Sequence, residues 1–141
     1  MSALSSLTRD YNNVLNGITS LNSELGVISD KTERLRIAAA EMQYCLEEIT
    51  DIGAAVAKIK IDGNLWEGKT KKDNESILED SLKTSLKEYH REVSDIYESY
   101  KNEISKLHQR HDNVSSSLQV KKAMKSHLKS EIKKEKESSD E

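Results

Sequence analysis

The chain has 141 residues, a length typical of one domain, and a formal net charge of −3. It contains no proline and no phenylalanine, and 33% of its residues are charged. Without proline nothing forbids long helices, and without phenylalanine a thick globular core is not expected. A net charge this small does not by itself indicate a nucleic-acid partner. The composition therefore favours helices with one buried stripe and several solvated faces.

The single cysteine, Cys45, excludes an internal disulfide and with it a disulfide-stabilised secreted fold. The first residues, Met1-Ser2-Ala3-Leu4, lack the basic and apolar regions of a cleavable secretory signal. No stretch reaches the apolar length of a membrane span. We therefore expect a cytoplasmic protein without stable membrane insertion, which could leave the cell only by a route that needs no cleaved signal.

The first predicted element is a helix over about residues 3–61, in which apolar residues repeat with a heptad period. With Leu4 at position a, every d position is apolar, and only Thr32 and Gly53 break the pattern at a. A repeat sustained over so many turns predicts a coiled-coil seam against a second helix. In the half of this helix that precedes the turn, the predicted seam includes Leu35, Met42, Leu46, Ile49 and Val56.

Towards its end the first helix carries more apolar side chains than one neighbouring helix can cover. The g positions suit water in its first half and are apolar in its second half, so the stripe widens. We interpret the widened face as a surface for an external partner, because apolar surface this broad is rarely left in water. An internal solution, in which the second helix crosses at a larger angle or folds back, stays open. The predicted partner-binding face comprises Ala38, Cys45, Ile52, Ile59, Ile37, Tyr44 and Ala55.

The helical patterns break only around residues 62–68, DGNLWEG, which include the only tryptophan of the chain. We predict a turn over residues 62–70, in which Gly68 permits the backbone geometry. Trp66 either closes the end of the hairpin over neighbours such as Leu65 and Ile61 or is recognised by a partner. The predicted turn motif is therefore Leu65, Trp66 and Gly68.

A second helix is predicted over about residues 71–120, where apolar residues again recur at helical steps. Some of these steps are four followed by four, which brings the local period closer to eleven residues per three turns. Two long helices joined by a short turn predict an all-α protein, a long antiparallel helical hairpin resembling a coiled coil, with a Trp-x-Gly turn. The predicted seam on the second helix includes Leu86, Tyr89, Val93, Ile96 and Tyr100.

Residues 121–141 form a predicted lysine-rich helical extension with a disordered acidic end at residues 137–141. We interpret the lysine tract as a solvated helix end, since runs of charge usually face water. The alternative is salt-dependent binding to an acidic membrane surface or a nucleic acid, lost when residues 121–141 are deleted. Because no aromatic stacking residues lie among the lysines and no nucleic-acid-binding motif occurs, we expect no nucleic-acid partner.

No motif in the sequence predicts catalysis. His108 and His111 lie three residues apart with Asp112 adjacent, but no further ligand stands at metal-site spacing. Cys45 lies among apolar residues, which is typical of a small buried hydrophobe. The chain lacks a phosphate-binding glycine loop, a metalloprotease helix motif and a nucleophile elbow. We therefore expect no catalytic residue, no metal and no cofactor.

The order of a helix, a turn with Leu65-Trp66-Glu67-Gly68 and a second helix resembles the WXG superfamily of small type VII secretion proteins. In that superfamily a Trp-x-Gly motif marks the turn of a helical hairpin. With its length and the segment KTERLRIA at residues 31–38, the chain is similar to the YwqH-like family. These are small helical proteins encoded beside LXG toxins in Gram-positive bacteria.

The resemblance implies an adaptor or chaperone that packs against the helical LXG domain of a toxin and helps present it to the secretion machinery. A second small helical accessory protein is a further candidate partner. Type VII substrates often carry a Tyr-x-x-x-Asp/Glu export signal after the second helix. None of Tyr89, Tyr97 and Tyr100 is followed by an acidic residue at that interval. A partner is therefore expected to supply any export signal, which favours an adaptor over an independently secreted protein.

The competing interpretation is a self-associating structural coiled coil, in which two hairpins form a homodimer. In that case the widened face of the first helix is covered by its own copy. A homo-oligomer of the isolated protein would be the expected sign of this arrangement.

Overall fold

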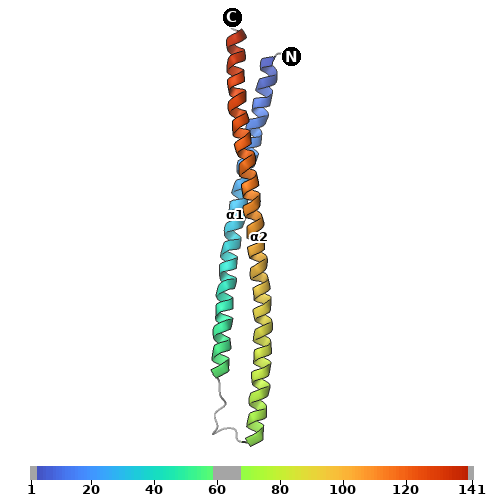
Figure 1. Cartoon of the computed structure of the whole chain (residues 1–141), viewed down its shortest axis with the longest axis vertical. Coiled ribbons are helices and arrows are strands. Elements are labelled where there is room, and N and C mark those ends of the chain that lie inside the picture. The colour runs from blue at the N-terminus through green and yellow to red at the C-terminus, as the bar shows by residue number, and fades with distance from the viewer. Residues whose placement is uncertain (1–2, 59–67, 140–141) are drawn as a thin grey trace. The chain divides into compact units, whose positions relative to one another are not determined.

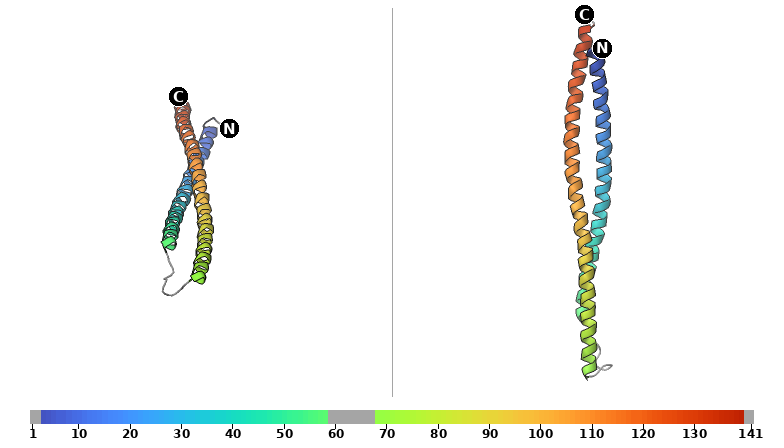
Figure 2. Two further views of the ribbon diagram at one scale, coloured as in Figure 1. Left: turned by 60° about the horizontal axis from the view of Figure 1, so that its bottom comes forward. Right: turned by 90° about the vertical axis from the view of Figure 1, so that its right-hand side faces the viewer.

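The computed structural model describes residues 3–58 and 68–139, with side chains over residues 3–56 and 77–138 (Figure 1). Two α-helices account for these residues: α1 spans Ala3–Lys58 and α2 spans Gly68–Ser139. The helices pack against each other in antiparallel directions, so the predicted all-α helical hairpin is confirmed (Figures 1 and 2). Leu65 and Trp66 of the predicted turn motif, and Ile59 of the predicted face, lie outside the described residues.

Helix α2 extends further than the sequence pattern predicts. It begins at Gly68 rather than near residue 71 and continues to Ser139 without a break at residue 120. The lysine-rich segment is therefore the last part of α2, and residues 137–139, which were expected to be disordered, are helical. The helix can continue because the segment contains no proline and because lysine and glutamate are good helix formers.

The chain forms two compact units, each built from a part of α1 and a part of α2. Unit 1 comprises Met1–Arg34 with Ile104–Glu141, and unit 2 comprises Leu35–Glu103. In unit 1 the core is a row of aliphatic side chains from both helices, each 9% exposed or less. Burial of such side chains stabilises the unit by about 1.5–3 kcal/mol each. The row consists of Val14, Ile28, Leu107, Val114 and Leu118.

Thr32 is a polar residue at a buried a position of unit 1, with 7% of its surface exposed. Its hydroxyl donates a hydrogen bond of 2.7 Å to the carbonyl oxygen of Ile28, one turn earlier in α1. The helix therefore satisfies this hydroxyl internally, which explains how the apolar seam accommodates it.

Unit 2 has a thinner core than unit 1. Among the side chains of unit 2 that the structure describes, the buried apolar ones are Ala39, Ile49 and Val93. The other residues of the row are half-buried: Leu35, Met42, Leu46 and Val56 on α1, and Leu82, Leu86 and Tyr100 on α2. Two helices alone cover these side chains only in part, so unit 2 leaves much apolar surface in contact with solvent.

Candidate partner-binding surface

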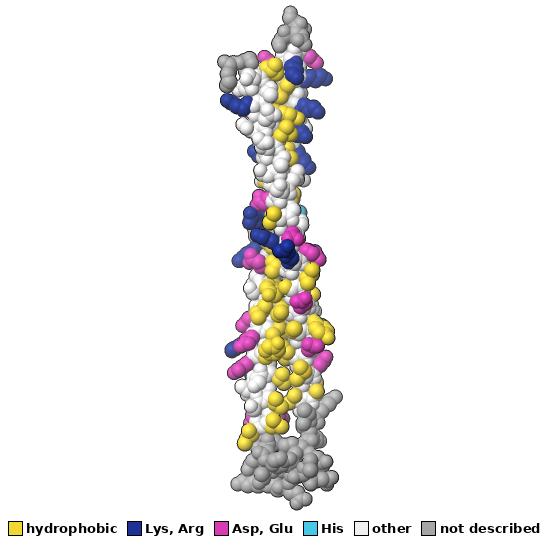
Figure 3. Space-filling model, turned by 180° about the vertical axis from the view of Figure 1, so that it is seen from behind, with side chains coloured by type: hydrophobic (Ala, Val, Ile, Leu, Met, Phe, Trp, Pro, Cys, Tyr) yellow, Lys and Arg dark blue, Asp and Glu magenta, His cyan; other side chains and the backbone are white. Residues whose placement is uncertain are grey.

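Large apolar side chains are exposed mainly in unit 2. Figure 3 shows hydrophobic side chains gathered over this part of the molecule, with carboxylates beside them. Unit 1 contributes only Val27, Val120 and Met124 to the exposed large hydrophobic residues among those described. Those in unit 2 are Ile37, Tyr44 and Ile52 on α1, and Ile77, Leu78, Tyr89 and Ile96 on α2.

The structure distributes the residues of the predicted partner-binding face between the edge of the seam and the solvent. Ala38 and Cys45 are half-buried, next to the seam. Ile37, Tyr44, Ile52 and Ala55 are exposed. Helix α2 does not cover these four residues. The alternative in which the second helix crosses at a larger angle or folds back over them is therefore not adopted.

Two residues that the sequence pattern placed in the α2 seam are exposed instead. Tyr89 is 52% exposed and Ile96 is 42% exposed, whereas the neighbouring Tyr97 is half-buried. A row with a period near eleven residues per three turns drifts around the helix relative to a heptad seam. The drift turns Tyr89 and Ile96 towards the flank of α2 and brings Tyr97 to the inside. The half-buried Tyr97 also carries the ammonium of Lys101, 5.3 Å from its ring centroid.

Six exposed residues of α1 in unit 2 form one continuous stripe, which we call the α1 stripe. It consists of residues separated by steps of four, three, four, four and three, which places them on one face of the helix. Two of its members are acidic and therefore do not contribute to the apolar pattern from which the partner-binding face was predicted. The α1 stripe comprises Ile37, Glu41, Tyr44, Glu48, Ile52 and Ala55, all of which are exposed.

Tyr44 and Glu48 interact within the α1 stripe. The phenol of Tyr44 donates a hydrogen bond to the carboxylate of Glu48. This bond, and next to it the negative charge of Glu48, raises the pKa of Tyr44 above its ordinary value. The hydrogen bond ties the Glu48 carboxylate to the centre of the stripe.

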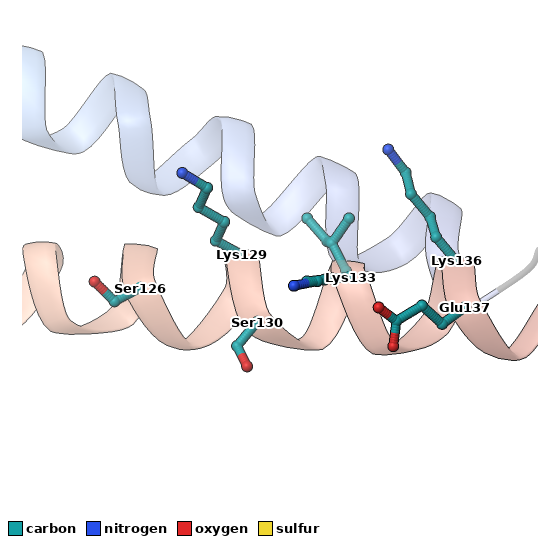
Figure 4. A pocket seen from close by; sticks show the side chains of 7 residues that line it. Ser126, Lys129, Ser130, Lys133, Lys136 and Glu137 are labelled. Carbon is teal, nitrogen blue, oxygen red and sulfur yellow. The ribbon is translucent and has the colours of Figure 1, made fainter.

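Two hollows of the described surface lack the features of an enclosed ligand site. One lies along the last part of α2 and is lined by lysines and serines such as Lys129 and Ser130 (Figure 4). Another lies in unit 1, where Asp10 and Val14 of α1 approach Met124 of α2. Both open broadly to solvent, whereas ligand and catalytic pockets surround most of their substrate.

Metal binding and membrane insertion also find no support in the described residues. No group of three histidine, cysteine, aspartate or glutamate side chains is placed there to hold a metal ion. His111 is half-buried, with its Nδ1 atom 3.7 Å from Oδ1 of Asp112, and His108 is exposed. Neither described helix has the length and apolar character needed to cross a bilayer.

Fold and surface together define a small helical hairpin protein with an uncovered apolar face in one of its two units. The family model described as YwqH-like matches residues 10–133, and the chain belongs to this YwqH-like family. The match covers most of both helices and indicates no catalytic family. No curated protein and no solved structure gave a match to the chain.

Proposed function

We propose that this YwqH-like protein is a non-catalytic helical adaptor. It binds the helical LXG-type targeting domain of a type VII secretion effector and promotes the export of that effector. The observation that carries the proposal is the exposure of Ile37, Tyr44 and Ile52, which is 54%, 61% and 50%. Contiguous apolar surface on a soluble domain usually marks an interaction site. The resemblance of the sequence to the WXG superfamily supports the choice of partner.

The geometry of the α1 stripe favours a helix as the bound element. A second helix packs against side chains that recur at steps of three and four residues on one helix face, and it contacts them turn by turn. Full burial of a large apolar side chain is worth about 1.5–3 kcal/mol, and these side chains are already about half covered. Each anchor therefore contributes roughly 1 kcal/mol, and several together are needed for a stable complex.

The position of Ile52 next to Ile49 provides a sharp test. Ile49 is 5% exposed and Ile52 is 50% exposed, although they lie three residues apart on the same helix. We expect Ile52→Ala to weaken binding of the purified effector helical domain by about tenfold, with little change in the free energy of unfolding. We expect Ile49→Ala to cost about 2–5 kcal/mol of stability, because it removes core volume.

Binding would be measured by calorimetry with the helical domain of the effector encoded beside the gene. Val27→Ala is the matched control, since Val27 is 53% exposed on α1 but belongs to unit 1. Its affinity should equal that of the wild type. The proposal is wrong if no complex forms with the effector domain, or if Ile52→Ala and Tyr44→Ala bind as tightly as the wild type.

Sedimentation of the pure protein separates the adaptor from a homodimer of hairpins. The adaptor predicts a monomer that forms a complex when the effector domain is added. A stable dimer that dissociates on Ile52→Ala would instead assign the exposed face to a second copy of the chain.

A further inference from the structure

Residues 37–57 of α1, which lie between Arg36 and Lys58, carry charge of only one sign. Between residues 37 and 57 the helix contains Glu41, Glu47, Glu48 and Asp51, and it contains no lysine or arginine. Glu41 and Glu48 belong to the α1 stripe itself, so an occupant of the stripe meets carboxylates within its contact area as well as at its edge.

The exposed flank of α2 in unit 2 repeats this arrangement. On a helical wheel with 100° per residue, the exposed Tyr89 and Ile96 lie on one side of the buried Val93. The exposed Glu92 lies further round the helix on the same side. Within residues 77–103 of α2 the lysines lie on the other side of the seam: Lys83, Lys87 and Lys101. In an antiparallel pair, this flank of α2 turns to the same side of unit 2 as Ile52, which lies at g on the edge of the α1 stripe nearest the seam. The combined apolar face is therefore bordered by carboxylates on both helices.

An entirely apolar helix would be a poor occupant of this face. It would remove water from Glu41 and Glu48 without supplying a countercharge, and a buried unpaired carboxylate is strongly unfavourable. A second copy of the chain, docked through the same face, would place carboxylates against carboxylates, because a twofold interface brings identical patches together. The charge pattern thus selects a partner of opposite sign.

We infer that the helix bound by this face is a basic amphipathic helix, in which lysine or arginine residues one heptad apart accompany the apolar stripe. Glu41 and Glu48 are seven residues apart, which is about 10.5 Å along a helix that rises 1.5 Å per residue. Two cations seven residues apart on a partner helix have the same separation and reach both carboxylates at once. This inference rests on the proposed function, because it names the chemistry of the partner that the adaptor takes.

Two synthetic helical peptides with the same apolar stripe test the charge preference with the intact protein. One peptide carries lysine at the stripe-flanking positions one heptad apart, and the other carries glutamate there. We expect the lysine peptide to bind at least about tenfold more tightly in fluorescence anisotropy, with an advantage that shrinks as salt is added. Equal affinities for the two peptides would overturn the inference.

Variants of the protein identify the carboxylates responsible. Glu41→Gln combined with Glu48→Gln keeps the size of the side chains and should reduce the preference for the lysine peptide by about tenfold. The control, Asp95→Asn combined with Glu98→Gln, changes the net charge equally at exposed positions of α2 away from the face, and it should retain the preference. An unchanged preference in the Glu41/Glu48 double variant would contradict the assignment.

The effector helical domain, measured with the same variants, separates the two proposals. If it binds in a manner that depends on Ile52 but not on Glu41 and Glu48, the adaptor role stands and the charge inference fails. If it does not bind at all while the lysine peptide is still preferred, the adaptor role fails and the charge inference stands.

Discussion

Arg110 of α2 holds one carboxylate oxygen of Glu24 on α1 with two of its nitrogens, at 2.9 Å from Nε and 2.6 Å from Nη2. The pair connects the two helices of unit 1 across 86 residues of sequence. Both side chains are partly solvated, with 60% and 35% of their surface exposed, so the pair is worth about 0.2–1 kcal/mol.

We expect Arg110→Lys to lower the free energy of unfolding by about 0.5 kcal/mol, because an ammonium cannot reproduce the two-nitrogen contact. Urea denaturation measures the change, and a double-mutant cycle built from Arg110→Ala and Glu24→Gln isolates the coupling between the two side chains. The loss should shrink at high salt. Arg91→Lys, at an exposed position of α2 in unit 2, is the control. A cycle with zero coupling at low salt would show that the pair contributes nothing to stability.

Thr32 and Thr19 provide a matched pair for the cost of a polar group in the seam. Both hydroxyls donate to the carbonyl oxygen four residues earlier, but Thr32 is buried and Thr19 is exposed. We expect Thr32→Val to stabilise unit 1 by about 0.5–1 kcal/mol, since a methyl replaces a hydroxyl inside the core. Thr19→Val should leave thermal stability nearly unchanged. Destabilisation by Thr32→Val would show that the hydroxyl makes a favourable net contribution to the packing.

Gly26 lies on the solvated side of α1, and a Cβ atom added there meets no atom within 4 Å. We expect Gly26→Ala to raise the free energy of unfolding by about 1 kcal/mol, because alanine restricts the unfolded chain and favours the helix. Ala40→Gly, at another exposed position of the same helix, should lower it by a similar amount. Both changes can be read from denaturation midpoints, and a destabilising Gly26→Ala would contradict the open surroundings of this position.

The hydrogen bond between Tyr44 and Glu48 predicts a titration signature. The pKa of Tyr44 is raised, so its phenolate should form at a higher pH than that of an ordinary tyrosine near 10. The pKa of Tyr44 is higher in the folded state than in the unfolded state. The interaction with Glu48 therefore contributes its full stabilisation of the folded state at pH values below the unfolded pKa. It is lost as the pH rises through the folded pKa.

Wild type and Tyr44→Phe are titrated with base and followed by ultraviolet absorbance. The difference between the two curves gives the ionisation of Tyr44 alone. Glu48→Gln should lower the pKa of Tyr44 towards its ordinary value, because the substitution removes the negative charge and leaves only a neutral acceptor for the hydrogen bond. Glu47→Gln is the neighbouring control and should leave the titration unchanged. Equal effects of the two substitutions would mean that Tyr44 does not bond specifically to Glu48.

The helical hairpin could be predicted from the sequence because a heptad repeat depends on local spacing alone. From Leu4 to Val56, every a and d position of α1 is buried or half-buried, including Thr32 and Gly53. The exposure of Ile52 beside the buried Ile49 also follows from the same periodicity, since one residue lies at g and the other at d.

The seam of α2 was predicted wrongly at Tyr89 and Ile96 for a physical reason. An apolar stripe with mixed steps is compatible with more than one seam, and only packing against α1 decides whether Ile96 or Tyr97 turns inward. The acidic members of the α1 stripe were missed for a different reason. Spacing places Glu41 and Glu48 on the stripe, but a hydrophobic repeat contains no information on which charged residues lie beside it.

One helical turn separates Ile49, which holds unit 2 together, from Ile52, which faces outwards. Random variation restricted to the outward positions of α1 would therefore leave the scaffold folded while changing what it recognises. A library of such variants, selected against helices of different charge, would yield hairpins with new binding specificities on an unchanged scaffold.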